Sequence, residues 1–207
     1  MRRLWIVLVL LLGLAYWAWP YAGAYAIARA AAAHDTAALA DRISEPDLKR
    51  SLGRQIIAAY LAKSGRGEKM GALQRGLVNA VGTTVASPYL DQLLSPDALA
   101  TLLGQGRIGS ITVGDRTVAI DRQVPNLSDV LHSHVTDVLL HSTYDGLTSF
   151  RFSVPEEGNA SGQDFGIHVR LRGLTWRLSG IDLPSDVLDR IATDAIAAER
   201  NGAKAGG

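Results

Sequence analysis

An uncharged apolar run near the N-terminus constrains this chain of 207 residues more than any other feature. Residues Leu4–Trp19 read LWIVLVLLLGLAYWAW, follow Arg2 and Arg3, and are separated from the next charged side chain, Arg29, by further uncharged residues. A membrane-spanning helix needs about 20 predominantly apolar residues. The uncharged window from Leu4 to Ala28 is therefore long enough to cross a lipid bilayer.

The flanks of this run favour one orientation in the membrane. Paired arginines before an apolar segment favour a cytoplasmic N-terminus, which places the C-terminal bulk of the chain outside. Trp17, Trp19 and Tyr21 fall where interfacial aromatic residues are enriched. We expect residues 1–19 to be a transmembrane anchor and residues 20–200 to be one extracytoplasmic domain.

A cleaved signal peptide is the alternative interpretation of the same segment. A basic start, an apolar run and small residues at alternate positions from Ala22 to Ala26 would suit a signal peptidase. However, apolar residues recur at helical spacing from Tyr21 to Ala32, as in a helix that packs on a domain. Because cleavage would remove half of that helix, we favour a retained anchor.

Composition excludes several classes of function. The formal net charge of +1 gives no overall field that would attract nucleic acid. The absence of cysteine excludes disulfides, thiolate metal sites and cysteine nucleophiles. A hydrophobic content of 47% supports a folded core even when the anchor is discounted.

The first two thirds of the chain predict helices separated by proline and glycine. We expect helices over residues 21–33, 36–43, 46–63, 70–86 and 128–140, with another short helix after Ser95. Asp35 or Thr36 should cap the second helix, and Ser87-Pro88 should end or kink the fourth. The glycine-rich segment from Gly104 to Asn126 either holds a small hairpin (Ile111–Val113 with Thr117–Ile120) or is mobile.

The last third of the chain changes to the alternation of β-strands. Apolar and polar residues alternate around Phe150 and Phe152, from Ile167 to Leu171 and from Leu174 to Leu178, with a tight turn at Arg172-Gly173. We expect Trp176, Leu174 and the phenylalanines on one core face. A final helix to about Arg200 should precede a disordered tail, residues 201–207. The predicted fold class is α+β: an N-terminal transmembrane helix, several helices, then a C-terminal antiparallel sheet with a final helix.

Several short motifs, in this order, resemble one family. They are Pro20-Tyr21, the His34–Leu39 segment, the Ser142–Leu147 segment before Phe150, and Arg172–Leu178 with Leu183-Pro184. The chain is similar, over roughly Trp19 to Pro184, to an uncharacterised bacterial family, domain of unknown function 2939. The resemblance implies a short Gram-negative protein anchored in the inner (plasma) membrane with its domain in the periplasm, and implies no activity.

The order of elements is also similar to NTF2-like, cystatin-like cones. In such folds the first long helix lies across a bent sheet and can roof a pocket, and they include both enzymes and binding modules. The extra helices between Pro46 and Leu103 are a departure from the plain cone.

His132, His134 and His141 are the single histidine cluster and the weak candidates for a metal site. As a strand, the first two would share a face and offer two nitrogens. No acidic or thiolate ligand stands at the spacing usual for zinc, so we favour surface or hydrogen-bonded histidines.

The polar face of the predicted sheet is the stronger candidate site. If the three strands pair in order, cationic side chains gather there: Arg151, His168, Arg170, Arg172 and Arg177. Such a stripe could bind an anionic glycan, a lipid headgroup or an acidic partner protein, although outward positions on strands are often charged without a ligand.

No catalytic pattern is evident in the sequence. Ser87, Ser133 and Ser142 lie outside any Gly-x-Ser-x-Gly turn, and the carboxylates show no paired spacing. We predict a non-enzymatic binding or interaction module without a cofactor, and the alternative is an NTF2-like enzyme with a pocket between the N-terminal helix and the sheet. Assembly through the sheet as a homodimer remains a third possibility.

Overall fold

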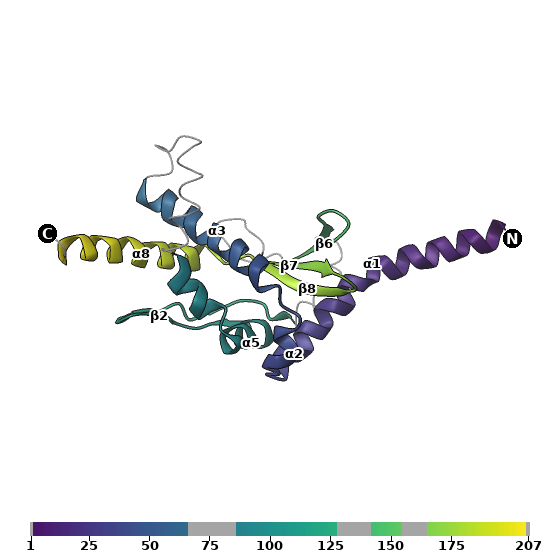
Figure 1. Ribbon diagram of the computed structural model, residues 1–207, viewed down its shortest axis with the longest axis horizontal. Helices are drawn as coiled ribbons and strands as arrows, with labels where there is room; N and C mark the ends of the chain where they lie inside the picture. The colour runs from purple at the N-terminus through teal and green to yellow at the C-terminus, as the bar shows by residue number, and fades with distance from the viewer. Residues whose placement is uncertain (1, 66–85, 128–141, 155–164, 206–207) are drawn as a thin grey trace.

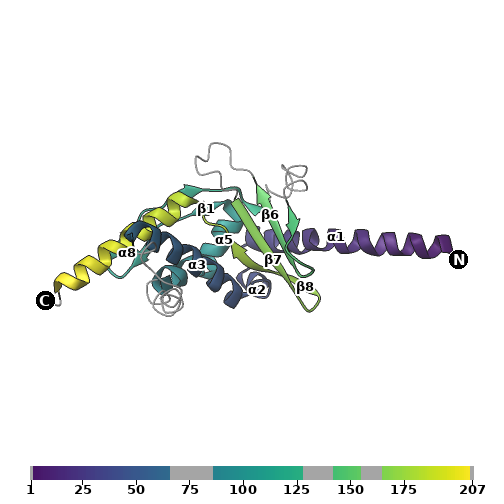
Figure 2. The same cartoon turned by 90° about the horizontal axis from the view of Figure 1, so that it is seen from above.

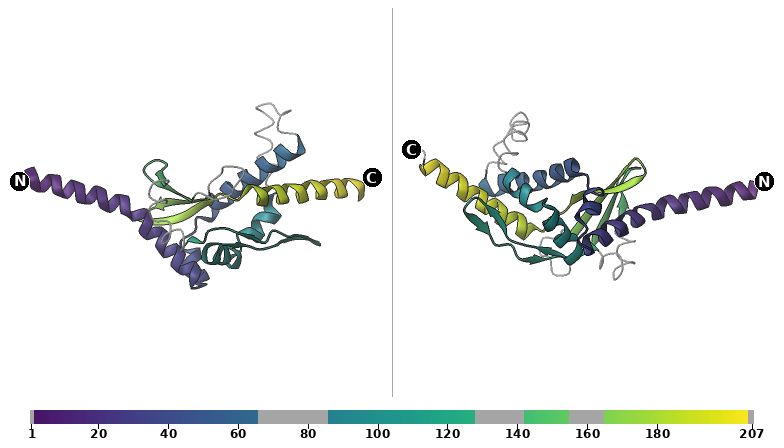
Figure 3. Two further views of the ribbon diagram at one scale, coloured as in Figure 1. Left: turned by 180° about the vertical axis from the view of Figure 1, so that it is seen from behind. Right: turned by 60° about the horizontal axis from the view of Figure 1, so that its bottom comes forward.

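The computed structural model describes residues 2–65, 86–127, 142–154 and 165–205 (Figure 1). The fold is α+β, as the sequence predicts. The helices are α1 (Arg2–Ala32), α2 (Thr36–Ala40), α3 (Glu45–Ser64), α5 (Pro96–Gln105) and α8 (Ser185–Ala205), with residues 86–93 also helical. The strands are β1 (Arg107–Ile108), β2 (Ile111–Val113), β3 (Arg116–Val118), β4 (Arg122–Gln123), β5 (Thr143–Tyr144), β6 (Ser149–Val154), β7 (Phe165–Arg172) and β8 (Thr175–Ile181). The two termini lie at opposite ends of the molecule (Figure 3).

Within the part of the chain that the structure describes, one helix has the length and composition to cross a membrane. It covers residues 3–32, and the large apolar side chains from Leu4 to Leu14 are exposed rather than packed on the domain. By contrast, Ala24, Ile27 and Ala31 in the same helix are buried in the domain core. The N-terminal half of α1 therefore projects away from the domain and its C-terminal half is part of it.

α1 runs without a break through Pro20, although we expected a separate helix to begin at Tyr21. Proline has no amide hydrogen, so the carbonyl four residues earlier, that of Tyr16, loses its helical donor. The Tyr144 hydroxyl donates a hydrogen bond to this carbonyl at 2.8 Å, and the Tyr16 hydroxyl donates to the Leu147 carbonyl. The two tyrosine rings stack with centroids 5.6 Å apart. The sheet thus supplies the donor that the proline lacks.

This compensation predicts a coupling between two positions far apart in sequence. Tyr144→Phe should leave the Tyr16 carbonyl without its donor and cost about 1 kcal/mol of unfolding free energy. In a Pro20→Ala background residue 20 donates again, so the same substitution should cost much less. Thermal unfolding of the four full-length proteins in mild detergent measures the coupling. Equal costs in the two backgrounds would contradict it.

The four-stranded sheet has the order β5-β6-β7-β8, and each neighbouring pair is antiparallel. The predicted turn between the last two strands is confirmed: Arg172 pairs with Thr175, and Gly173 has a φ of 63°, which favours glycine. The prediction that Leu174 shares the core face with Trp176 is wrong. Leu174 is 79% exposed because it belongs to the turn and is lifted off the sheet.

α1 covers the apolar face of this sheet (Figure 2). The Tyr21 ring meets the rings of Phe150 and Phe152 edge-on, with centroids 5.4 and 5.3 Å away. Gly23 approaches Trp176 so closely that a Cβ atom would overlap the indole side chain. Both phenylalanines and Trp176 are buried, which confirms their predicted place in the core.

α3 and the segment before it flank the outer side of β8. Backbone hydrogen bonds of 2.8 Å join Ser44 and Arg42 to Leu178, so this segment pairs with the edge strand. Further along α3, the Gln55 side chain donates to the carbonyl of Ile181 at 2.8 Å. These contacts fix α3 along β8.

The remaining predicted elements have mixed outcomes. Asp35 caps α2 and Ser95 caps α5, each by accepting a hydrogen bond from the backbone amide three residues later. Of the two alternatives for the glycine-rich segment, the structure has the hairpin, β2 with β3, together with a second strand pair, β1 with β4. The helix across residues 86–93 contains Ser87-Pro88, where we expected a helix to end or kink. α8 continues to Ala205, past the expected end at Arg200 and into the tail predicted to be disordered. The predicted helix over residues 70–86, except residue 86, and the whole of that over residues 128–140 lie outside the described residues.

Candidate functional site

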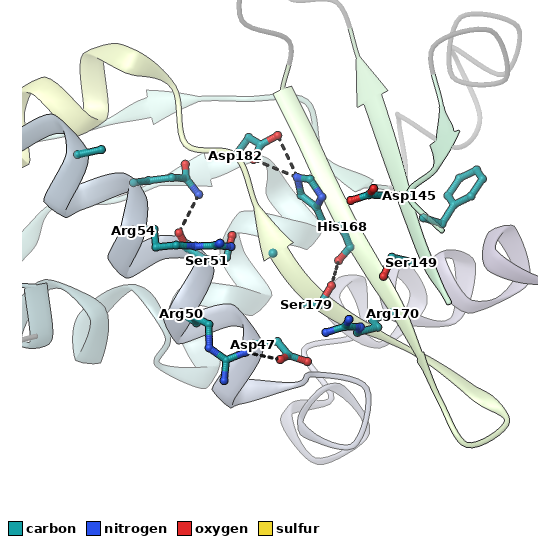
Figure 4. Close-up of a pocket in the computed structure, with 14 residues that line it drawn as sticks. Asp47, Arg50, Ser51, Arg54, Asp145, Ser149, His168, Arg170, Ser179 and Asp182 are labelled. Atoms are coloured by element: carbon teal, nitrogen blue, oxygen red, sulfur yellow. Dashed lines mark hydrogen bonds and ion pairs between the residues drawn. The ribbon is translucent and has the colours of Figure 1, made fainter. Parts of the chain in front are cut away.

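A groove of about 520 Å³ lies between α3 and the sheet, on the face opposite α1 (Figure 4). We call it the polar groove. It is lined by Asp47, Arg50, Ser51, Arg54, Gln55, Ala58, Asp145, Ser149, Phe150, His168, Arg170, Ser179, Gly180 and Asp182. The strand residues here alternate with the buried Ile167 and Val169, so the groove lies on the polar face of the sheet.

The polar groove lies elsewhere than the pocket that the alternative function led us to expect. We predicted the pocket of the alternative enzyme between the N-terminal helix and the sheet. There the rings of Tyr21, Phe150 and Phe152 pack against one another, and Trp176 packs on α1 at Gly23. The polar groove instead uses α3, which the sequence did not link to the sheet.

Two features hold α3 over the polar face. Gly180 has no side chain, and a Cβ atom there would lie 2.9 Å from the Ser51 hydroxyl, so glycine permits the close approach of helix and strand. Asp47, at the start of α3 and 8% exposed, accepts a hydrogen bond of 2.7 Å from Arg172 of β7. It also accepts hydrogen bonds from Ser44 at 2.8 Å and Arg50 at 3.2 Å.

The Arg172 guanidinium, followed by the Ser44 hydroxyl, holds the pKa of Asp47 below its usual range. Hydrogen bonds to the ionised form stabilise it, so this carboxylate is charged at neutral pH. Asp47 thereby neutralises Arg172 and links α3 to the sheet. It is a structural member of the groove rather than a group poised to transfer protons.

Asp182, just after β8, organises the other end of the polar groove. Its carboxylate accepts a hydrogen bond of 2.7 Å from Arg151 and lies 3.0 Å from Nε2 of His168. A Cβ atom at Gly166 would overlap this carboxylate, so glycine is needed for the arrangement. Asp182 thus neutralises Arg151 and orients the imidazole of His168 in the groove.

Three arginines at or beside the groove form no ion pair with a described acidic side chain, although the charge of Arg170 contributes to lowering the pKa of Asp47. Arg54 of α3 and Arg170 of β7 line the groove (Figure 4 labels both), and Arg177 of β8 stands directly opposite Arg170 on the neighbouring strand. Like charges directly opposite on neighbouring strands are destabilising. The Nε atom of Arg177 is also buried with no hydrogen-bond partner in the part of the chain that is described. An anion bound in the groove would meet the guanidinium groups of Arg54 and Arg170, which line it.

The predicted cationic face is present, and part of it serves the fold. Its five members lie on one face of the sheet, as the alternation predicts. Arg151, His168 and Arg172 are engaged by aspartates, whereas Arg170 and Arg177 form no ion pair with a described side chain. Sequence reasoning missed Arg50 and Arg54. The sequence showed only that both lie outside the apolar stripe of α3. Charged residues that simply face solvent occupy the same positions, so this pattern does not indicate a binding site.

Other sequence candidates gain no support from the described residues. His132, His134 and His141 lie outside them, so the metal site stays untested. In the described segments no group of three or more metal-ligating side chains comes together.

One comparison with known proteins identifies a part of the chain. A family model described as Protein of unknown function (DUF2939) matches residues 9–102. This match supports a domain of unknown function 2939 over those residues. The DUF2939 match runs from α1 into α5, and so includes α3 with its groove arginines. It begins before Trp19 and ends before the sheet, so the resembling motifs beyond residue 102 lie outside it. No curated protein and no solved structure matches the chain.

Proposed function

We propose that this protein is a non-enzymatic binding module that takes up a multiply charged anion in the polar groove. The observation that carries the proposal is that Arg54 and Arg170 line the groove from α3 and β7 without an ion pair to a described residue, with Arg177 directly opposite Arg170 on β8. Guanidinium groups bind phosphate and carboxylate through paired, charge-assisted hydrogen bonds. The ligand class is therefore a molecule with phosphate or carboxylate groups.

Electrostatic balance supports this proposal. Among the residues that the structure describes, three aspartates (Asp47, Asp145 and Asp182) lie at or beside the groove with six arginines (Arg50, Arg54, Arg151, Arg170, Arg172 and Arg177). Such an excess concentrates anions in a concave site. Arginines on an open surface would contact an anion from one side only. Here α3 holds Arg54 opposite the strands, so the groove presents positive charge from two sides.

The binding test uses the full-length protein in nanodiscs of zwitterionic lipid, with tripolyphosphate as the probe. Arg54→Ser combined with Arg170→Ser should weaken its affinity at least about tenfold, because each charge-assisted hydrogen bond contributes roughly 1.5–3 kcal/mol. Arg107→Ser with Lys63→Ser removes the same charge from surface ion pairs elsewhere and should leave the affinity within about twofold.

A second arm identifies the source of the anion. If phosphatidylglycerol in the nanodisc lowers the affinity for tripolyphosphate, the groove takes a lipid headgroup; if it has no effect, the groove takes a free anion. Wild-type protein that binds neither probe would refute the proposal, as would equal losses in the groove and control variants.

We further propose that α1 is retained as a single-pass anchor in the inner membrane of a Gram-negative cell, with the domain in the periplasm. Arg2 and Arg3 favour a cytoplasmic N-terminus. Cleavage within residues 22–26 would sever α1 upstream of Ile27 and Ala31, which are fully buried in the core. Removal of Tyr16 and Tyr21 would also expose the aromatic face of the sheet.

Reporter fusions after Ala205 test this topology. Alkaline phosphatase, which is active outside the cytoplasm, should be active in the fusion, and green fluorescent protein should be dark when exported unfolded. Replacing Arg2 and Arg3 by Glu should reduce or invert the difference. If, for the native sequence, the green fluorescent protein fusion were fluorescent and the alkaline phosphatase fusion inactive, a periplasmic domain would be contradicted.

An enzyme is the second candidate function, and one contact favours it. The Asp182 carboxylate lies 3.0 Å from His168 Nε2, an arrangement that orients histidine in general bases. Among the described residues, however, no hydroxyl is hydrogen-bonded to the His168 ring. If the site hydrolyses phosphate esters, His168→Gln should abolish turnover of p-nitrophenyl phosphate; the binding module predicts no turnover in either protein.

A further inference from the structure

The turns at one end of the sheet carry two exposed leucines that the polar groove does not use. Leu147, in the turn between β5 and β6, is 80% exposed, and Leu174, in the turn between β7 and β8, is 79% exposed. The Leu171 amide donates to the Thr148 carbonyl at 2.7 Å, which places the two turns side by side at the same end of the sheet. We call these two turns the leucine rim.

The leucine rim lies where α1 leaves the domain. Along α1 toward its N-terminus, Tyr21 contacts Phe150 and Phe152, and then Tyr16 contacts Tyr144 and the Leu147 turn. The direction in which the free half of α1 projects is therefore the direction in which the turns point. Figure 2 shows the β7–β8 turn and the N-terminal half of α1 on the same side of the domain.

The geometry of α1 then limits the distance between the domain and a membrane. The run from Leu4 to Ala15, which precedes the contact at Tyr16, contains 12 residues. At about 1.5 Å per residue it is about 18 Å long. The hydrocarbon core of a bilayer is about 30 Å thick. A spanning α1 must therefore draw Tyr16 and its surroundings to the membrane surface or below it, with local thinning of the bilayer taking up part of the mismatch.

The connection between α1 and the sheet transmits this requirement to the turns. Two hydrogen bonds and a ring stack join Tyr16 to Tyr144 and Leu147, so the leucine rim cannot move away while α1 stays in place. We infer that Leu147 and Leu174 insert into the interfacial layer of the bilayer beside α1. They would give the domain a fixed orientation on the lipid surface. This inference rests on the anchoring role of α1 in the proposed function and is independent of what the polar groove binds.

The absence of native cysteine allows a direct test with single-cysteine variants of the full-length protein. Leu147→Cys and Leu174→Cys report on the rim, Leu10→Cys reports on the anchor, and Asp115→Cys reports on an exposed turn remote from α1. Each variant is labelled with the environment-sensitive dye NBD and reconstituted into liposomes. Quenching by iodide in water is then compared with quenching by lipids that carry a spin label near the headgroup or deep in the acyl chain.

We expect the label at residue 10 to be quenched by the deep spin label and the label at residue 115 by iodide alone. Labels at residues 147 and 174 should be quenched several-fold more by the shallow spin label than by iodide. If the label at residue 10 were quenched by the deep spin label while the label at residue 147 or 174 were quenched by iodide alone, the inference would be overturned and the anchor would remain supported. A label at residue 10 in water would overturn the anchor as well.

A second measurement separates insertion from simple proximity. Leu147→Asp with Leu174→Asp places charges in the rim, and both positions are exposed in the domain, so the fold should tolerate them. NBD at residue 115 then serves as the acceptor for a donor fluorophore at the lipid surface. The distribution of donor–acceptor distances measured by energy transfer should broaden in the double variant, because the domain loses its fixed orientation. An unchanged distribution would contradict a role of the leucines in orienting the domain.

Discussion

Trp176→Ala should lower the melting temperature of the full-length protein by roughly 10 °C, because truncating a buried tryptophan costs about 3–5 kcal/mol. Trp176 is 1% exposed. It packs against the α1 backbone at Gly23, and its ring lies 6.4 Å from that of Tyr144. The cavity would open between α1 and the sheet, where neither element can close it without breaking the tyrosine contacts. This loss is a large fraction of the 5–15 kcal/mol that stabilises a typical domain.

Trp176→Phe is the matched control for this prediction. The indole N–H is buried with no hydrogen-bond partner among the described residues, so its removal relieves an unsatisfied donor. Phenylalanine keeps most of the apolar volume, and the expected cost is about 1 kcal/mol or less. Circular dichroism melts in mild detergent compare the variants. If the phenylalanine variant lost as much stability as the alanine variant, the indole would be making a polar contact that this account lacks.

Asp47→Asn should cost about 1–2 kcal/mol at neutral pH, after allowance for the solvent exposure of Arg172. Asparagine has nearly the same shape but carries no charge and replaces one acceptor oxygen by an NH2 donor, so the bonds on that side are lost and those to the remaining oxygen lose their charge assistance. Because α3 is held over the sheet by this carboxylate, the substitution should also weaken tripolyphosphate binding at the polar groove. Asp115→Asn, at an exposed turn, should change neither property.

The pH dependence of this effect has a definite sign. The pKa of Asp47 is lowered by its hydrogen bond from Arg172, below the ordinary value of 3.8. The folded state therefore binds this proton less readily than the unfolded state, and the stabilisation is complete above pH 3.8. It disappears as the pH falls through the lower folded-state value. The stability difference between wild type and Asp47→Asn should be flat near neutral pH and shrink below 3.8; a difference that grows with acidity would contradict the assignment.

The sequence predicted the sheet well because one face of each strand is buried. Alternation around Phe150 and along β7 assigned the core face, and the same alternation placed Arg170 and Arg177 on the opposite face. Leu174 followed the alternation in the sequence but not in the structure, because a two-residue turn takes its members out of the pleat. The period-two patterns thus predicted the buried and exposed faces of the strands correctly, but they failed in the turn where the chain reverses.

The groove could not be predicted, because its walls meet through contacts between distant segments. Asp47 and Arg172 are separated by 125 positions, and nothing in either local pattern links them. The approach of α3 depends on Gly180, which in the sequence looks like any weak point in a strand. Likewise, Pro20 indicated a helix boundary, and only the position of Tyr144 shows why the helix continues.

The segment beside β8 has a consequence for self-association. A sheet margin with free amides and carbonyls is a template on which another chain can add a strand. Here the Ser44 amide donates to the Leu178 carbonyl and the Leu178 amide donates to the Arg42 carbonyl. This edge of the sheet is therefore already paired with a segment of the same chain. Two copies joined through β8 would first have to peel this segment away, together with the start of α3. Any homodimer of this protein should therefore use a surface other than the β8 margin.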